Sequence, residues 1–489
     1  MRTQRRTLAM GVAAAVAMVL IASWSTNSQW GRGRSPPMEF DASASDDGED
    51  DILQAVEDKA ADVEDSQDEV PAELEQQSSD EGSQSSSGAE DDSETIMLPP
   101  GPTEVHIVFV MSCSQRNRLL QQTVVQTSAA SVGQRGPMTQ VITGCSDDER
   151  ELAMQEPVLY HDFRRHFAPS YSPHPVPGVE DHFDPYNQAF GLRHYLHHVV
   201  FPTNDTVFAL IEGDFVFLRK LEVNTGDSVQ DYYHGSRDPA KVSDTVRDGA
   251  ALAQDWMDID GAGWFAKDKR DDLAKICSNK PCNTVSEEEA LEDYAAIGPP
   301  YLITRRDLSK MIDDYCDFVV EGRKRDQQDW NALTRAYSAA AANSQIRHMK
   351  LSNLGVTSPP FSKDGHEYWE FVDADFSNPC EDPFEVAMPE NPPVAIHYSQ
   401  WLFDFYSGFV PANISSCASG MLRVPPASDW TEINATVRDS LREFRRHEVW
   451  AKCSLFKVMN RALKRIKEHQ CPNGFNAYQD IEPYKPVTS

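Results

Sequence analysis

Beyond the first hundred residues, short apolar runs alternate with longer amphipathic stretches. The run His106–Met111 has the composition of a buried strand and leads into Ser112-Cys113-Ser114. A helical stretch follows at Arg118–Ser131, and Gly136-Pro137 marks a turn before a second strand at Met138–Thr143. This order of strand, helix and strand predicts a parallel pair joined by a right-handed crossover.

The same alternation continues through the middle of the chain. A second helix is predicted at Asn187–His198, and the apolar strand Thr206–Ile211 runs directly into Glu212-Gly213-Asp214. Near the C-terminus, large apolar residues recur among many Arg and Lys over Arg438–His469, which predicts an amphipathic helix that ends before Pro472. We find no internal repeat. Alternating strands and helices at this spacing predict an α/β fold.

The N-terminal residues have a different pattern. Leu8–Trp24 is an almost unbroken apolar run of 17 residues, and three arginines precede it. By the positive-inside rule these arginines hold the N-terminus in the cytosol. We expect a cytosolic tail over residues 1–7 and a signal anchor over residues 8–24, hence a single-pass type II protein of the Golgi or ER membrane. A cleaved signal peptide is the alternative, because the run is short for a membrane helix and rich in Ala.

A strongly acidic stretch follows the apolar run. Residues 41–94 hold 21 acidic residues and one Lys, which accounts for -20 of the formal net charge of -32. Such a segment buries too little apolar surface to offset its ordering entropy, and its charges repel one another. We therefore expect residues 25–102 to form a disordered, extended stalk rather than a calcium-binding segment. The acidic charge also argues against nucleic acid as a partner.

The cysteines and glycosylation sequons are typical of a protein in the lumen of the secretory pathway. All nine cysteines lie in the globular part, so most are expected to pair in an oxidising lumen, leaving an odd one free or paired between chains. Cys277 and Cys282 have no matching pair nearby, which favours disulfide bonding over zinc binding. Three Asn-x-Ser/Thr sequons begin at Asn204, Asn413 and Asn434.

Candidate chemistry lies at the end of the third predicted strand. The segment Val207–Phe217 places Glu212 and Asp214 after an apolar strand, and ligands of open α/β sheets bind beyond the carboxyl ends of strands. Two carboxylates suit Mg²⁺ or Mn²⁺, which keep open positions for phosphate oxygens. The alternative interpretation is an acidic turn in an acidic protein.

Six short segments extend this interpretation over residues 103–409, namely Gly133–Gln140, Tyr186-Asn187, Glu212–Asp214, Gly298–Tyr301, Trp330–Tyr337 and Val394–Tyr398. In order and content they resemble motifs of the peptidyl-serine α-galactosyltransferase and hydroxyproline O-arabinosyltransferase group of plants and algae. These are GT-A-type glycosyltransferases, whose patterns include G-P-x-T-R, Asp-x-Asp or Glu-Pro-Asp, G-P-P-Y and I-x-H-Y.

The resemblance implies a GT-A-like (Rossmann-like) nucleotide-sugar-binding catalytic domain over residues 103–410, with a C-terminal extension over residues 411–489. It implies a retaining, metal-dependent glycosyltransferase that moves galactose or arabinose from a UDP-sugar to hydroxyproline or serine hydroxyls of secreted glycoproteins.

The resemblance also implies roles for individual residues. The Mn²⁺ or Mg²⁺ ligands would be Glu212, Asp214 and His397, because GT-A enzymes commonly complete the metal site with a late histidine. Ser112 and Asn187 would lie near the nucleotide. Taken without the resemblance, His397 at the end of an apolar strand is typical of a core histidine.

The sequence departs from the family pattern at three positions. Gln140 stands where Arg is usual, Leu333 where the helix motif carries an acid, and Arg335 where it carries Tyr. Asp326 and Asp329 are close in sequence, and either would supply the missing catalytic carboxylate. The departure at Leu333 supports an alternative function as a catalytically inactive lumenal binding or scaffold protein with the same fold. A calcium-dependent adhesion module is a third hypothesis, which depends only on the acidic stalk.

Overall fold

The computed structural model describes residues 101–481, apart from 175, 177–179, 202, 204, 358–365, 373–374, 383–384, 399–409 and 412. The expected cytosolic tail, signal anchor and nearly all of the stalk lie outside the described residues. Among those residues, no helix is both long enough and apolar enough to cross a membrane.

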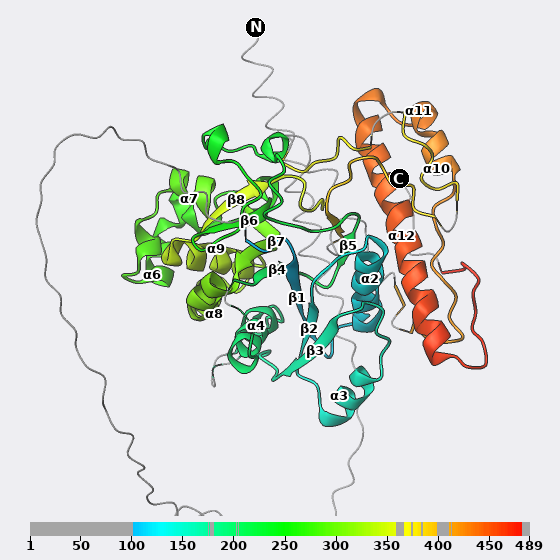
Figure 1. Ribbon diagram of the computed structural model, residues 1–489, viewed down its shortest axis with the longest axis horizontal. Coiled ribbons are helices and arrows are strands. Elements are labelled where there is room, and N and C mark those ends of the chain that lie inside the picture. The colour runs from blue at the N-terminus through cyan, green and yellow to red at the C-terminus, as the bar shows by residue number, and fades with distance from the viewer. Residues whose placement is uncertain are drawn as a thin grey trace, which may run out of the picture. The chain divides into compact units, whose positions relative to one another are not determined.

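A mixed sheet of seven strands forms the centre of the described part, in the order β3-β2-β1-β4-β7-β6-β8 (Figure 1). Its strands are β1 (Val105–Ser112), β2 (Met138–Thr143), β3 (Phe163–Ala168), β4 (Val207–Ile211), β6 (Ala250–Asp255), β7 (Ile297–Thr304) and β8 (Arg347–Leu351). β1 to β4 run parallel to one another, which confirms the predicted parallel pair β1–β2. β7 is antiparallel to both β4 and β6, so the sheet is mixed.

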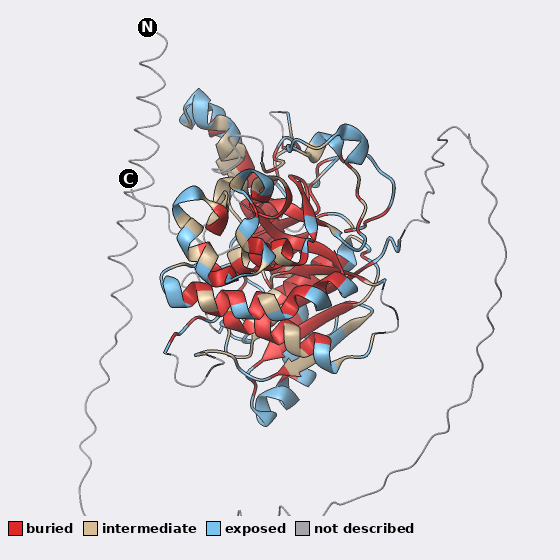
Figure 2. Cartoon of the chain, turned by 90° about the vertical axis from the view of Figure 1, so that its left-hand side faces the viewer, coloured by how far each residue is buried: buried red, intermediate tan, exposed pale blue. Residues whose placement is uncertain are grey.

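Helices cover both faces of this sheet. The helices of the described residues are α2 (Arg118–Ser131), α3 (Asp147–Met154), α4 (Tyr186–His198), α5 (Met257–Asp260), α6 (Arg270–Cys277), α7 (Glu287–Asp293), α8 (Arg305–Arg325), α9 (Ala332–Ser344), α10 (Ser428–Thr431), α11 (Ile433–Thr436) and α12 (Arg442–Gln470). Successive side chains of a strand point to opposite faces. Val108 of β1 therefore packs in the core beneath α4, α8 and α9, whereas Ile107 and Phe109 pack in the core beneath α2. Figure 2 shows the strands buried between these layers.

A smaller two-stranded sheet lies beside the central one. β5 (Phe215–Phe217) pairs antiparallel with β9 (Ala395–His397), with Phe215 opposite His397. The C-terminal helix α12 packs against α2, and its Trp450 and Leu455 share a hydrophobic core with Val216 and Ile396 of this small sheet. The small sheet is therefore supported from both α2 and α12.

Four disulfides join the described residues: Cys113–Cys145, Cys277–Cys282, Cys380–Cys453 and Cys417–Cys471. Cys316 is the buried free cysteine. The prediction that most cysteines pair and an odd one stays free is confirmed. Cys277 pairs with Cys282, so the two cysteines form a disulfide rather than a zinc site. The first disulfide links the residues that follow the ends of β1 and β2.

Candidate functional site

The carboxyl end of β4 brings Glu212 and Asp214 next to His397. β5 begins directly after Asp214, and its antiparallel register with β9 places His397 beside the two carboxylates. Nε2 of His397 lies 3.2 Å from Oε2 of Glu212 and 3.3 Å from Oδ1 of Asp214. One ligand atom from each residue lies within 4.8 Å of the others. We call these three residues the carboxylate–histidine cluster.

The chemistry of the cluster suits a hard divalent cation. Its donors are two carboxylates and one imidazole, an accepted ligand set for Mn²⁺, and Mg²⁺ also binds carboxylate oxygens. Burial lowers the pKa of His397, but Asp214 and Glu212 outweigh burial and raise it to about 10. The two carboxylates thus strongly favour positive charge at this point. The three residues fit a bound cation.

Aromatic rings fix the orientation of the His397 imidazole. The Phe215 ring stacks against it at 4.6 Å between centroids, and the Trp256 ring lies nearly parallel to it at 6.0 Å. Trp256 in turn packs onto Gly298, where an added Cβ would lie 2.1 Å from the indole. Only glycine leaves room for Trp256 at this position, which gives a physical reason for the glycine in the segment Gly298–Tyr301.

A cavity of about 50 Å³ adjoins the cluster. Its lining includes Glu212 and Gln188 together with the apolar side chains of Leu210, Tyr301 and Leu333. The leucine that departs from the family pattern therefore lies at the site itself, in the same cavity as a predicted metal ligand. A carboxylate at this position would face the cavity, whereas Leu333 makes this part of the cavity wall apolar.

The two predicted catalytic aspartates lie outside the cluster. Asp329 has a side chain that is only 6% exposed, and its oxygens accept a bond from Trp264 Nε1 at 3.0 Å and pair with Arg335 at 3.0 Å. Arg335 also pairs with Asp260 at 2.7 Å. Asp326 is exposed at the end of α8, where its Oδ1 accepts from the backbone N–H of Gln328. Asp329 is thus held by its contacts with Trp264 and Arg335. A catalytic role for either aspartate stays a prediction.

The predicted nucleotide-binding residues lie on two different elements. Ser112 ends β1, at the same edge of the sheet as the end of β4, and its hydroxyl bonds to that of Ser114. Asn187 is buried in the first turn of α4, where its Oδ1 accepts from the backbone N–H of Tyr171 at 2.8 Å. Asn187 therefore holds the segment after β3, and its contact with a nucleotide stays a prediction.

Trp256 and Asp260 were missed by the sequence reasoning. Trp256 is the stacking partner of His397, and Asp260 is the buried partner of Arg335. Both follow β6, whose short apolar run carries no motif. The available signal was Arg335 itself, since an arginine within the predicted helix motif is expected to pair with an acidic residue nearby.

No protein-family model matches the sequence, and no curated protein matches it either. Solved structures with some similarity to this chain include an active-site mutant of LgtC (TM-score 0.34, 11% identity, 70% of this chain and 100% of that one). They also include the galactosyltransferase LgtC with donor and acceptor sugar analogs (TM-score 0.33, 10% identity, 60% and 87%) and the bifunctional glycosyltransferase WbbM (TM-score 0.34, 11% identity, 62% and 47%). Similarity at this level supports no conclusion about the function of this protein.

Proposed function

We propose that this protein is a metal-dependent glycosyltransferase with a GT-A-like catalytic domain and a nucleotide sugar as donor. The observation that carries the proposal is the carboxylate–histidine cluster. It lies beyond the carboxyl end of β4, the edge at which open α/β sheets bind their ligands.

The residues of the cluster have different roles in this proposal. A Mn²⁺ or Mg²⁺ ion held by Glu212, Asp214 and His397 would neutralise charge on a diphosphate leaving group. The Asp214 side chain is 13% exposed and that of Glu212 is 32% exposed. In this proposal Asp214 binds the ion directly, while Glu212, which lines the cavity, holds the ion through a water molecule or contacts the ribose. Phe215 and Trp256 hold the imidazole ring and exclude water from one side.

The sequence resemblance supports a finer version of this proposal. The donor would be a UDP-sugar carrying galactose or arabinose, and the acceptor a hydroxyproline or serine hydroxyl of a secreted glycoprotein, with retention at the anomeric carbon. One observation favours a second candidate: Leu333 lines the cavity where the motif has an acid. A protein that binds the nucleotide sugar but does not turn it over would fit that departure.

A donor screen with the purified full-length protein tests the proposal. UDP release would be measured for a panel of UDP-sugars with Mn²⁺, with and without a chelator, and with Hyp- or Ser-containing peptides as acceptors. We expect release from at least one donor that stops when the metal is chelated. Metal-dependent UDP binding without release or transfer would support the inactive candidate. If no metal-dependent UDP binding is found, both candidates are wrong.

We further propose that the described domain lies in the lumen of the Golgi or ER, behind an N-terminal anchor. Its four disulfides support an oxidising compartment. The sequon residues Asn413 and Asn434 are exposed and so accessible to a glycan, whereas Asn204 lies outside the described residues.

Removal of N-glycans is therefore expected to increase the gel mobility of the protein made in eukaryotic cells. Asn434→Gln should remove one glycan and abolish part of that shift, because Asn434 is exposed in α11. Asn473→Gln is the matched control, since Asn473 begins no sequon. Identical mobility before and after glycan removal would contradict the lumenal placement.

A further inference from the structure

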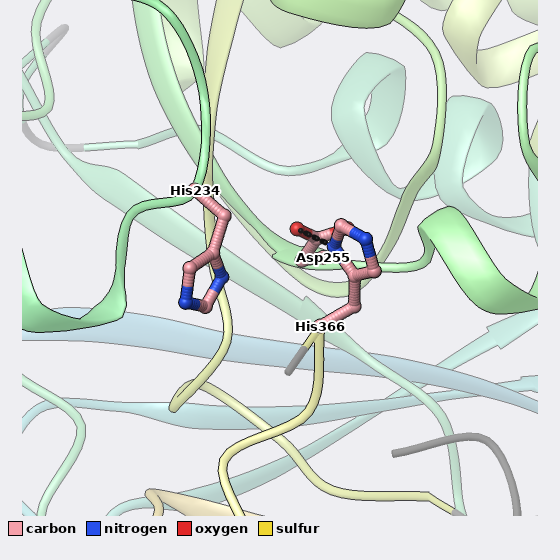
Figure 3. A group of neighbouring side chains, drawn as sticks. All are labelled: His234, Asp255 and His366. Atoms are coloured by element: carbon pink, nitrogen blue, oxygen red, sulfur yellow. Dashed lines mark hydrogen bonds and ion pairs between the residues drawn. The ribbon is translucent and has the colours of Figure 1, made fainter. Parts of the chain in front are cut away.

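A second group of potential ligands lies at the end of β6. It consists of His234, Asp255 and His366, and one ligand atom from each lies within 4.8 Å of the others. Figure 3 shows the Asp255 carboxylate bonded to His366, with the His234 imidazole facing the pair. The group shares no residue with the carboxylate–histidine cluster.

The fold fixes the carboxylate of this group and leaves one histidine free to adjust. Asp255 is the last residue of β6 and is 3% exposed. Its Oδ1 accepts from the backbone N–H of Met257 at 2.9 Å, so its Oδ2 is the oxygen that faces the histidines, 3.0 Å from Nδ1 of His366. His234 is exposed, and its ring lies edge-on to that of His366 at 6.0 Å between centroids.

The distance between Asp255 and His366 is close to that between two ligands of one small transition metal. A tetrahedral Zn²⁺ ion at about 2.0–2.2 Å from each ligand atom separates those atoms by about 3.3 Å. The Asp255–His366 pair has 3.0 Å between its two atoms, and a ligand atom of the exposed His234 lies within 4.8 Å of both. Two imidazoles and one carboxylate form a donor set that favours Zn²⁺ over Mg²⁺.

The charges around the three residues are compatible with a bound cation. Asp258 acts electrostatically on His366 and adds a negative charge to the surroundings. Lys350 is also near His366, but its ammonium group donates to the backbone carbonyl of Leu291. The lysine therefore has a hydrogen-bond partner of its own, while its positive charge also acts on Asp255.

We propose that His234, Asp255 and His366 form a second metal site, which takes Zn²⁺ with water in the open position. The bound ion would tie the segment after β5 and the segment before β9 to the end of β6. Trp256 follows Asp255 and stacks on His397, so the ion would also steady one wall of the carboxylate–histidine cluster. The proposal stands independently of glycosyl transfer.

Zinc titration of the chelator-treated full-length protein tests this proposal. A chromophoric zinc indicator would compete for the metal in excess Mg²⁺, which occupies carboxylate sites, including those of the acidic stretch over residues 41–94. We expect one tight Zn²⁺ per chain. His234→Gln should weaken binding at least about 100-fold, more than the loss of an outer-shell partner does. Because His234 is exposed, this variant should keep its fold.

Three comparisons make the result decisive. His366→Gln should weaken Zn²⁺ binding as His234→Gln does, and Asp214→Asn should leave it unchanged. His194→Gln is the matched control, because His194 on α4 contacts His166 and His198 and represents an adventitious histidine site. Zinc should also raise Tm by about 2–4 °C in wild type and not in His234→Gln. Unchanged binding in both His234→Gln and His366→Gln, or loss of binding in His194→Gln, would overturn the proposal.

Discussion

Asp214→Asn is expected to abolish metal-dependent UDP binding and to lower the turnover of a nucleotide sugar by at least about 10³-fold. The substitution keeps the shape of the side chain but removes the charge that lies 3.3 Å from Nε2 of His397. Calorimetry with UDP and Mn²⁺ would measure the loss. His397→Ala should weaken metal binding less, because an imidazole binds a metal ion in its neutral form and so adds no charge to the ligand set.

Asp205→Asn is a suitable control for this experiment. Asp205 precedes β4, its side chain is 82% exposed, and its pairing with Arg306 at 3.8 Å is a surface contact. Its substitution should leave UDP and Mn²⁺ binding unchanged. Equal metal-dependent affinity in wild type and Asp214→Asn would remove Asp214 from the site, and with it the main reason for regarding the protein as an enzyme.

The largest loss of stability is expected from Asp181→Asn. The Arg323 guanidinium of α8 donates two bonds to Asp181, at 2.9 and 2.7 Å, and both side chains are only 6% exposed. The same guanidinium lies over the Phe183 ring, and Tyr186 of α4 donates to Asp181 at 2.9 Å. Neutralising Asp181 would leave a buried, unpaired arginine, which typically costs about 3–5 kcal/mol.

Urea unfolding of the disulfide-intact protein would measure this loss as a lower midpoint at an unchanged slope. Asp272→Asn is the control: Asp272 pairs with Lys275 at 3.8 Å, with side chains 43% and 56% exposed, so it should change the unfolding free energy by less than about 1 kcal/mol. A similar loss in both variants would show that the buried Asp181–Arg323 pair contributes no more to stability than an exposed pair.

Local patterns predicted individual elements well. The predicted helix over Arg118–Ser131 and the predicted strand over Met138–Thr143 have the same bounds in the structure as α2 and β2. Their apolar periodicity depends on neighbouring residues alone. The direction of β7 (Ile297–Thr304) had no such signal, because strand direction depends on how the long preceding connection folds back.

The two candidate sites likewise differ in how far the sequence predicts them. A strand that ends in two carboxylates is visible in the sequence, and the resemblance supplied His397, which the structure places beside them. His366 and Asp255 are 111 residues apart, and no spacing rule connects them. The pairing of Arg335 with Asp329 was likewise not predicted, since Asp329 lies before the start of α9.

The register of β5 with β9 has a consequence for the timing of synthesis. Glu212 and His397 are 185 residues apart, so at ordinary translation rates of about 5–20 residues per second the carboxylates leave the ribosome roughly 10–40 s before the histidine. Cys453 and the rest of α12, which support the small sheet, emerge later still. The nascent chain therefore passes through a period in which the parallel strands are complete but the donor set for a cation is not.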